Sequence, residues 1–247
     1  MVITMTNQKG GVSKTTTAWL MGIGLQRRGF KVMLVDLDPQ TSLSYLLQAD
    51  KKKPAISDLL TGSATIQEVI QATPEGLFFI AGNTRMVSMI SSIEQTAIKE
   101  TFDPVKEIVD YIILDTPPAL SALTVAAAIA ADRIIIPTQA SSMALSGIMK
   151  LYTSAIVIAQ KINPELIIDG ILLTRYNGRS IINRQLKALL DDIATACGTK
   201  VYQTTIRQSV AVEEAQSAQK DLFAYAPNAP VTKDYERFID EFLRGES

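Results

Sequence analysis

The sequence contains no histidine and only one cysteine, and these absences narrow the chemistry that the chain can carry out. Without histidine there can be no Ser-His-Asp triad, no imidazole general base and no imidazole metal ligand. Cys197 on its own cannot form an internal disulfide, a cysteine zinc site or an iron–sulfur site. Catalysis or metal binding would therefore depend on carboxylates, hydroxyls, lysines and backbone amides.

An excess of charge and long apolar runs are also missing. The 247 residues include 24 basic and 25 acidic ones, so a nucleic-acid site would have to be a local basic patch. The longest mainly apolar stretch, 119–131, contains Ser121 and Thr124, and it falls short of the roughly 18 residues that a membrane span needs. The first six residues lead into Asn-Gln-Lys without the apolar core of a signal peptide. The sequence therefore predicts a cytoplasmic protein.

Short apolar, β-branched segments alternate with longer helical patterns along the whole chain. Strands are expected at 2–5, 31–36, 77–81, 111–115, 133–137, 167–174 and 200–203, and helices at 14–28, 42–47, 84–101, 120–130, 145–162, 181–197 and 231–243. Near-continuous runs of Val, Ile and Leu are typical of strands that are covered on both faces. No linker or repeat divides the chain. We therefore expect one α/β domain over residues 1–247, with a doubly wound, mostly parallel sheet flanked by helices.

A loop with two adjacent glycines follows the first expected strand and reads Asn7-Gln8-Lys9-Gly10-Gly11-Val12-Ser13-Lys14-Thr15-Thr16. Adjacent glycines allow a tight turn that directs successive N–H groups to one point, and the following helix adds the positive end of its dipole. This pattern predicts a polyphosphate cradle in which Lys14 contacts the β- and γ-phosphates and the Thr15 hydroxyl binds Mg²⁺. The alternative is a plain Gly-Gly turn before a helix rich in lysine and threonine.

Carboxylates stand at the ends of two further strands, where open α/β sheets bind their ligands. Asp36 and Asp38 lie at the end of the second expected strand, and Asp115 ends the strand 111–115. Alternate residues point the same way, so Asp36 and Asp38 can both face a cation or an attacking water. Asp115 is placed as the acid of a Mg²⁺–phosphate site. Asp36 or Asp115 could instead cap the helix that follows, but three such carboxylates beside the loop favour a nucleotide site.

Together, the loop, Asp36-Leu37-Asp38-Pro39-Gln40 and Asp115-Thr116-Pro117-Pro118 resemble the deviant Walker A ATPases of the ParA/MinD group, and within it the ParA partition ATPases. The resemblance extends along essentially the whole chain and implies a deviant P-loop fold with ATP and Mg²⁺ as cofactors. It implies that Lys9 reaches the partner's phosphates across a nucleotide-sandwich homodimer, that Lys14 is the P-loop lysine, and that Asp38 positions or activates the water. The implied ATP-binding residues are Lys9, Gly10, Gly11, Val12, Ser13, Lys14, Thr15, Thr16 and, at the adenine, Asn177; the implied metal-site residues are Thr15, Asp36 and Asp115.

The resemblance also implies a role in plasmid or chromosome partition. The ATP-bound homodimer would bind non-specific double-stranded DNA on the nucleoid, and a ParB-like centromere-binding protein would stimulate hydrolysis and release it. Arg179 matches a DNA-contacting arginine of the family, and Arg184, Arg207 and Lys220 could extend the basic patch. The family often has a second arginine where this chain has Ala211, so we expect weaker or shifted DNA binding.

One further departure from the family pattern and two other functions remain open. Ser13 replaces a more common glycine, and a positive φ there would cost on the order of 1–2 kcal/mol. A MinD-like membrane ATPase would end in a basic amphipathic helix, whereas residues 235–244 have mixed charge, so we expect a terminal helix packed on the core and no membrane partner. An ATPase that positions a protein cargo would share the same nucleotide chemistry.

Overall fold

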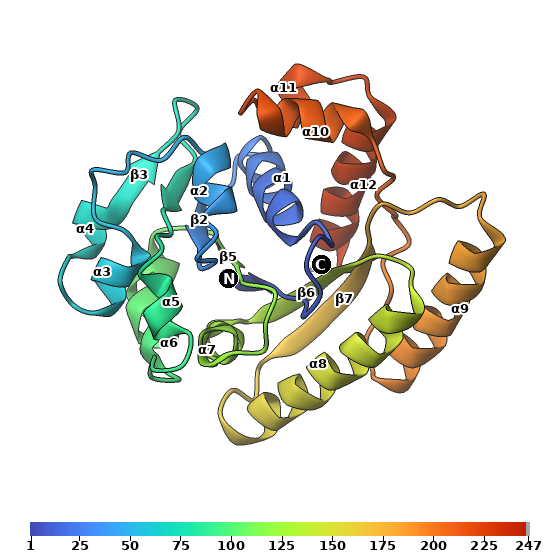
Figure 1. Cartoon of the computed structure of the whole chain (residues 1–247), viewed down its shortest axis with the longest axis horizontal. Helices are drawn as coiled ribbons and strands as arrows, with labels where there is room; N and C mark the ends of the chain where they lie inside the picture. Colours follow the sequence, from blue (N-terminus) through green and yellow to red (C-terminus); the bar gives the residue numbers. More distant parts are fainter. Residues whose placement is uncertain (246–247) are drawn as a thin grey trace.

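A seven-stranded sheet forms the centre of the computed structural model, which describes residues 1–245 (Figure 1). The strands are β1 (Val2–Met5), β2 (Val32–Asp36), β3 (Ile70–Ala72), β4 (Phe78–Ile80), β5 (Tyr111–Asp115), β6 (Arg133–Thr138) and β7 (Ile167–Leu173). Their order across the sheet is β3-β4-β2-β5-β1-β6-β7. All neighbouring strands are parallel except β3 and β4, which are antiparallel.

Helices cover both faces of this sheet (Figure 1). They are α1 (Lys14–Gln26), α2 (Ser42–Leu46), α3 (Ile56–Leu60), α4 (Ile66–Val69), α5 (Met86–Met89), α6 (Ala97–Phe102), the 3-10 helix η1 (Asp103–Glu107), α7 (Ala122–Ala130), α8 (Ser142–Lys161), α9 (Ile181–Ala196), α10 (Val210–Ser217), α11 (Leu222–Tyr225) and α12 (Pro230–Arg244). The expected fold class, a doubly wound and mostly parallel sheet flanked by helices, is confirmed.

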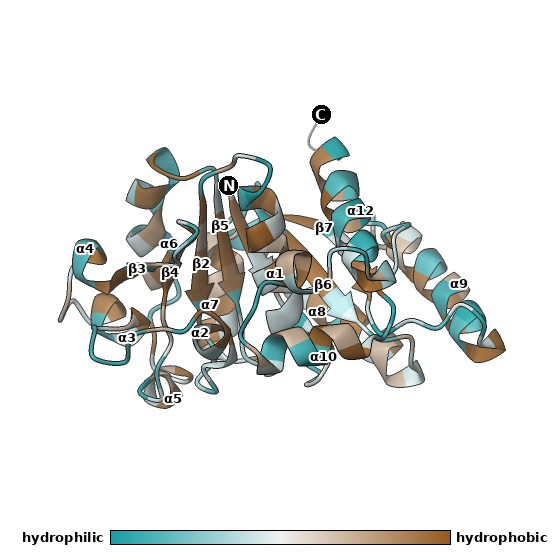
Figure 2. Ribbon diagram, turned by 90° about the horizontal axis from the view of Figure 1, so that it is seen from above, coloured by the Kyte–Doolittle hydropathy of each residue, from teal (hydrophilic) through white to brown (hydrophobic). Residues whose placement is uncertain are grey.

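Alternate residues of the central strands fill separate cores on the two faces. In β5, Ile113 packs in the core beneath α1, whereas Ile112 and Leu114 pack in the core that includes α6 and α7. This arrangement makes the central strands hydrophobic on both sides, and β2 and β5 are accordingly brown in Figure 2. The apolar runs in the sequence therefore correspond to strands covered on both faces.

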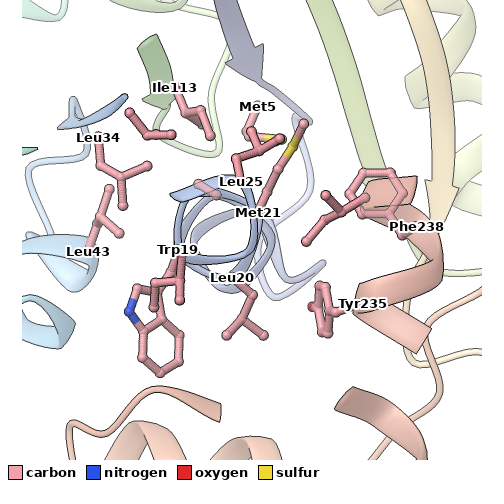
Figure 3. Packing of buried hydrophobic residues seen from close by; sticks show 14 of the residues in the cluster. Met5, Trp19, Leu20, Met21, Leu25, Leu34, Leu43, Ile113, Tyr235 and Phe238 are labelled. Atoms are coloured by element: carbon pink, nitrogen blue, oxygen red, sulfur yellow. The ribbon is translucent and has the colours of Figure 1, made fainter. Parts of the chain in front are cut away.

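Helix α1 is the central helix of one face. Figure 3 shows α1 surrounded by packed apolar side chains. The labelled residues come from α1 itself (Trp19, Leu20, Met21 and Leu25), from the sheet (Met5, Leu34 and Ile113), from α2 (Leu43) and from α12 (Tyr235 and Phe238). On the α12 side, Tyr235, Phe238 and Phe242 are buried, and Arg28 forms a 2.6 Å ion pair with Asp240. The apolar stripe near the end of the chain is thus used in packing, as expected for a terminal helix on the core.

Two expected elements are wrong. The helix expected at 84–101 is two short helices, α5 and α6, separated by turns over 90–96. Only Met86 and Ile98 are buried there before Thr101, so no continuous apolar stripe supports a single long helix. The strand expected at 200–203 is an isolated bridge between Val201 and Ile171. The antiparallel edge strand β3 was not expected, because its three residues are too few to show a pattern.

Helix α8 is the one helix among residues 1–245 that is long and apolar enough, by length and composition alone, to cross a membrane. In the fold it packs on the sheet through Ala144, Ile148, Leu151, Ala155 and Ile158. Because core helices of other proteins meet the same criterion, this property is weak evidence for membrane insertion.

Candidate functional site

The loop between β1 and α1 is held in place by side chains from distant strands. The Gln139 side chain, just beyond β6, donates to the Gly11 carbonyl at 3.0 Å. The Thr174 hydroxyl, just beyond β7, lies 3.1 Å from both the Val12 and the Thr138 carbonyl oxygens and shares its single proton between them. Neither anchoring residue was expected from the sequence, although both follow a strand, where ligand-binding residues gather in this type of sheet.

Two residues of this loop have left-handed backbone conformations. Gly11 has φ 73° and Ser13 has φ 65°. Glycine adopts such angles without steric cost, whereas serine pays on the order of 1–2 kcal/mol. Ser13 therefore has the positive φ for which the sequence predicts an energetic cost, and its backbone is strained.

Lys14 begins α1 and is almost completely buried, with 7% of its surface exposed. Its Nζ donates to the Lys9 carbonyl at 3.4 Å. Burial lowers the pKa of Lys14, while the negative charges of Asp115 and Asp38 act in the opposite direction. A buried ammonium with one long hydrogen bond has capacity for further acceptors, which phosphate oxygens would supply. Lys9 is half-buried, and its N–H donates to Asn7.

Asp36 and Asp115 lie directly opposite each other on the paired strands β2 and β5. Asp36 uses both of its oxygens within the protein. One oxygen accepts from the Ser44 N–H (2.8 Å) and hydroxyl (2.6 Å), and the other accepts from the Asp38 N–H (3.1 Å). Burial raises the pKa of Asp36 to about 6, although the Ser44 hydrogen bonds lower it. Asp36 therefore fixes the positions of α2 and of Asp38.

Asp115 differs from Asp36 because it is fully buried and, within residues 1–245, no backbone N–H holds its oxygens; the neighbouring Thr15 hydroxyl is the side-chain donor that interacts with them. Burial raises its pKa well above the ordinary value and the charge of Asp36 adds to this, whereas Thr15 and Lys14 lower it. A buried carboxylate with so few hydrogen bonds is costly. The site therefore fits a cation, or a water bound to a cation, beside Asp115 and the Thr15 hydroxyl.

The loop and Asp38 line one cavity of about 1270 Å³, whereas the buried Asp36 and Asp115 lie behind its wall. Its wall includes the loop residues Gly10, Gly11, Ser13, Lys14, Thr15 and Thr16 and also Asp38. Arg175 and Arg207 line it as well. The volume exceeds the roughly 300–1,000 Å³ typical of small-molecule sites, so a nucleoside triphosphate fits. Among residues 1–245, no three acidic, cysteine or histidine side chains gather as a metal cluster. A magnesium ion would therefore rely on phosphate oxygens for part of its coordination, as is usual for Mg²⁺.

Asn177, the expected adenine contact, is exposed and is not among the residues that line this cavity. Its side-chain oxygen instead accepts from the Arg179 N–H at 3.0 Å. Arg175, two residues earlier, lines the cavity with a left-handed backbone (φ 49°) and was missed. Its position directly after Thr174 at the end of β7 is the signal that could have identified it.

The four expected DNA-contacting residues do not share one environment. Arg179 and Arg184 are exposed at the start of α9, and Lys220 is exposed after α10. Arg207 forms an ion pair of 2.6 Å with Asp234, whose side chain is 1% exposed and also binds Arg237 at 2.5 Å. The charge of Arg207 is therefore partly neutralised, whereas no such ion pair engages Arg179 or Arg184 in the described chain.

The chain is similar to known proteins along most of its length. Residues 1–168 match the family model described as an AAA domain. The chain is 33% identical over 236 residues to the sporulation initiation inhibitor protein Soj of Bacillus subtilis, covering 92% of each chain. It is 34% identical over 243 residues to the chromosome-partitioning ATPase Soj of Thermus thermophilus, covering 98% of this chain and 94% of that protein.

A solved structure titled cobyrinic acid a,c-diamide synthase, from Mycobacterium smegmatis with bound ADP and magnesium, has the same fold. Its TM-score is 0.82 at 28% identity, over 98% of this chain and 94% of that one. The resemblance drawn from the motifs is confirmed by these matches, and the chain belongs to the ParA/MinD superfamily of partition ATPases.

Proposed function

We propose that residues 1–247 form one ATPase domain that partitions plasmid or chromosomal DNA. In this proposal an ATP-bound homodimer binds non-specific double-stranded DNA on the nucleoid in the cytoplasm, and a ParB-like centromere-binding protein stimulates hydrolysis and release. The observation that carries the proposal is the buried carboxylate of Asp115 beside Thr15 and Lys14, both of which line the cavity together with the glycine loop.

The cofactors are ATP and Mg²⁺. When bound, Mg²⁺ neutralises charge on the phosphates and favours attack at the terminal phosphorus. The Thr15 hydroxyl and the Asp115 carboxylate would hold the ion, because they are the oxygen groups next to Lys14 that have capacity left. Asp36, also expected in the metal site, acts by orienting Asp38, since its oxygens already accept protein hydrogen bonds.

The protein's own groups account for the remaining steps. Lys14 binds the phosphates, and their charge, added to that of Asp115 and Asp38, keeps the buried ammonium protonated. Asp38 lines the cavity, and one of its oxygens accepts from the Gln40 N–H at 3.0 Å, which restrains the carboxylate; in this proposal Asp38 positions or activates the attacking water. Lys9 is half-buried and is not among the residues lining this chain's own cavity, which supports a role at the phosphates of a partner subunit.

Of the four expected DNA-contacting residues, Arg179 and Arg184 have the strongest support as groups that bind DNA. Both are exposed at the start of α9, and the Arg184 guanidinium donates to the Gly178 carbonyl at 3.1 Å, which holds the two arginines near each other. Lys220 extends the positive surface in this proposal, and Arg207 contributes less because Asp234 binds it. The apolar side of α12 packs on α1 and is therefore not available to bind a membrane, so this helix does not support the MinD-like alternative.

The test is retention of an Asp38→Ala variant on non-specific duplex DNA at low salt, with ATP or with ADP. We expect retention with ATP only, lost as salt rises, because blocked hydrolysis keeps the dimer in its DNA-binding state. Adding Arg179→Ala should weaken retention. Adding Lys187→Ala should not, since Lys187 lies farther along α9 and is paired with Asp191 at 2.9 Å. Dimerisation with ATP but no retention on DNA would refute the DNA role and favour a protein cargo.

A further inference from the structure

Helix α10 forms part of the cavity wall although it is weakly packed on the domain. Among its eight residues only Ala215 is buried, and Ala211 and Val212 are partly buried against the core. The residues of α10 that line the cavity are Val212, Glu213, Gln216 and Ser217. Segments with few buried apolar contacts open more readily than the rest of a fold. The cavity therefore has one wall that can move without disrupting the core.

Two glutamines join the end of α10 to the end of α2, which lies beside it (Figure 1). The Gln48 side-chain amide donates to the Gln219 carbonyl at 3.1 Å, and the Gln219 side-chain amide donates to the Tyr45 carbonyl. Gln48, Gln219 and Tyr45 all line the cavity. We call these paired hydrogen bonds the Gln48–Gln219 latch, because they connect one wall of the cavity to another.

Both glutamines stand where a helix end favours glycine. Gln48 has φ 55° and Gln219 has φ 50°. In both places the N–H of the glutamine bonds to the carbonyl three residues back, and the next N–H bonds to the carbonyl five residues back. This is the Schellman motif, whose left-handed residue is usually glycine. Helices α1, α3 and α9 end in the same motif and have Gly29, Gly62 and Gly198 at that position.

The contrast isolates what the two glutamines add. Glycine holds the left-handed conformation without steric cost, so it would serve the backbone better than glutamine at the ends of α2 and α10. The two helix ends that lack glycine are the two whose side chains bond across the cavity. The feature gained in exchange for backbone strain is therefore the latch itself.

The latch also connects the two sides of the proposed nucleotide site. On the α10 side, the Gln216 amide donates to the Thr16 hydroxyl of the phosphate loop at 2.9 Å. On the α2 side, the Ser44 hydroxyl donates to Asp36 at 2.6 Å. Movement of α10 away from α2 would therefore open the cavity next to the phosphate loop.

We propose that α10 is a lid on the nucleotide cavity and that the Gln48–Gln219 latch holds this lid closed. The inference rests on the proposed ATPase function, since it assigns nucleotide exchange at that site to one moving element. The latch consists of two neutral hydrogen bonds at the protein surface, so it can open while the domain stays folded. Because it joins protein atoms only, it restrains α10 both when nucleotide enters and when nucleotide leaves.

Gln48→Gly and Gln219→Gly each remove one hydrogen bond of the latch and supply the residue that the left-handed position favours. Relief of backbone strain offsets the lost hydrogen bond, so both variants should fold with urea midpoints close to that of the parent protein. Stopped-flow fluorescence of each full-length protein measures association and dissociation of a fluorescent ADP analogue with Mg²⁺. We expect both rate constants to rise about twofold to tenfold, the effect of one neutral hydrogen bond, while Kd changes less than about twofold.

Gln26→Ala is the matched control. The Gln26 side-chain amide donates to the Glu75 carbonyl at 2.6 Å, which is the same kind of bond, and Gln26 is not among the residues that line the cavity. Its rate constants should equal those of the parent protein.

Three results would overturn the latch. The first is parent-like rate constants in the glycine variants, and the second is an equal rise in Gln26→Ala. The third is faster dissociation with unchanged association, because the side chains would then contact the nucleotide instead of restraining the lid. Each glycine variant tests the latch by itself, so one folded variant is enough. Failure of the parent protein to bind the ADP analogue is a separate result, which would refute the proposed ATPase function.

Discussion

Replacing Ser44 by alanine removes a hydroxyl that joins two segments at the carboxyl edge of the sheet. The hydroxyl donates to Asp36 at 2.6 Å and accepts from the Gly82 N–H at 2.8 Å. In Ser44→Ala the Gly82 N–H loses its partner, and Asp36 keeps only the backbone N–H of position 44, at 2.8 Å, on that oxygen. The variant therefore breaks one hydrogen bond to a charged group and one between neutral groups.

The size of the effect follows from these two bonds. A hydrogen bond to a charged group contributes about 1.5–3 kcal/mol and a neutral one about 0.5–1.5 kcal/mol, so the loss at pH 7.5 is about 2–4.5 kcal/mol. The pKa of Asp36 is raised, mainly by burial, to about 6, so its carboxyl is ionised at pH 7.5 and protonated in the folded protein at pH 5. At pH 5 both bonds are neutral, and the loss should fall to about 1–3 kcal/mol.

The assay is urea unfolding at both pH values, followed by the fluorescence of Trp19, which is the chain's single tryptophan and is 2% exposed. Ser42→Ala is the matched control, because Ser42 lies on the same helix, is exposed, and should change the free energy of unfolding by less than about 0.5 kcal/mol. A loss for Ser44→Ala no larger than the control, or equal losses at pH 7.5 and pH 5, would refute this reasoning.

Three further predictions concern the same region and the cysteine. The pKa of Asp115 is raised in the folded state, so ionisation of this carboxyl destabilises the fold as pH rises above the pKa of the unfolded state. Without ligands at pH 7.5, Asp115→Asn should therefore unfold at a higher urea concentration than the parent protein, and the difference between the two urea midpoints should narrow toward pH 4. Equal urea midpoints at pH 7.5 would contradict this. Gly82→Ala places a Cβ 2.9 Å from the Asp36 carbonyl and should cost about 1–3 kcal/mol in urea unfolding, whereas Gly147→Ala, with no atom within 4 Å of the new Cβ, should cost nothing. Burial raises the pKa of the Cys197 thiol, so a disulfide reagent at pH 7.5 should label it far more slowly in native protein than in urea, and equal rates would contradict its burial.

The strands and the phosphate loop were predictable because their signals are local. The strands at 2–5 and 111–115 match β1 and β5 residue for residue, since each is a short apolar run that the sheet buries on both faces. The meeting of Asp36 with Asp115 followed from the rule that parallel strands end at one edge. The prediction of one helix over 84–101 was wrong because this segment has too few buried residues to stabilise a single long helix, and it forms two short helices instead.

The contacts that hold the site were not predictable, because they join residues far apart in the sequence. Thr174 and Val12 are separated by 162 residues, and no local pattern marks the hydroxyl as an anchor for the loop. The ion pair of Arg207 with the buried Asp234 also joins residues far apart in the sequence. It partly neutralises the charge of an arginine that the sequence alone suggests is available to bind DNA. The position of Asn177 outside the cavity depends on the turn after β7, where Arg175 adopts a left-handed backbone.

The packing of α12 against α1 sets an order of events during protein synthesis. Helix α1 begins at the phosphate loop near the start of the chain, yet the side chains that cover it, Phe238 and Phe242 among them, are made after every other described helix and strand. On the ribosome, α1 therefore keeps part of its apolar surface uncovered, and the loop lacks its anchors Gln139 and Thr174, until the later segments have been made. The nucleotide site should consequently be completed only late in synthesis, close to the time when α12 leaves the ribosomal exit tunnel.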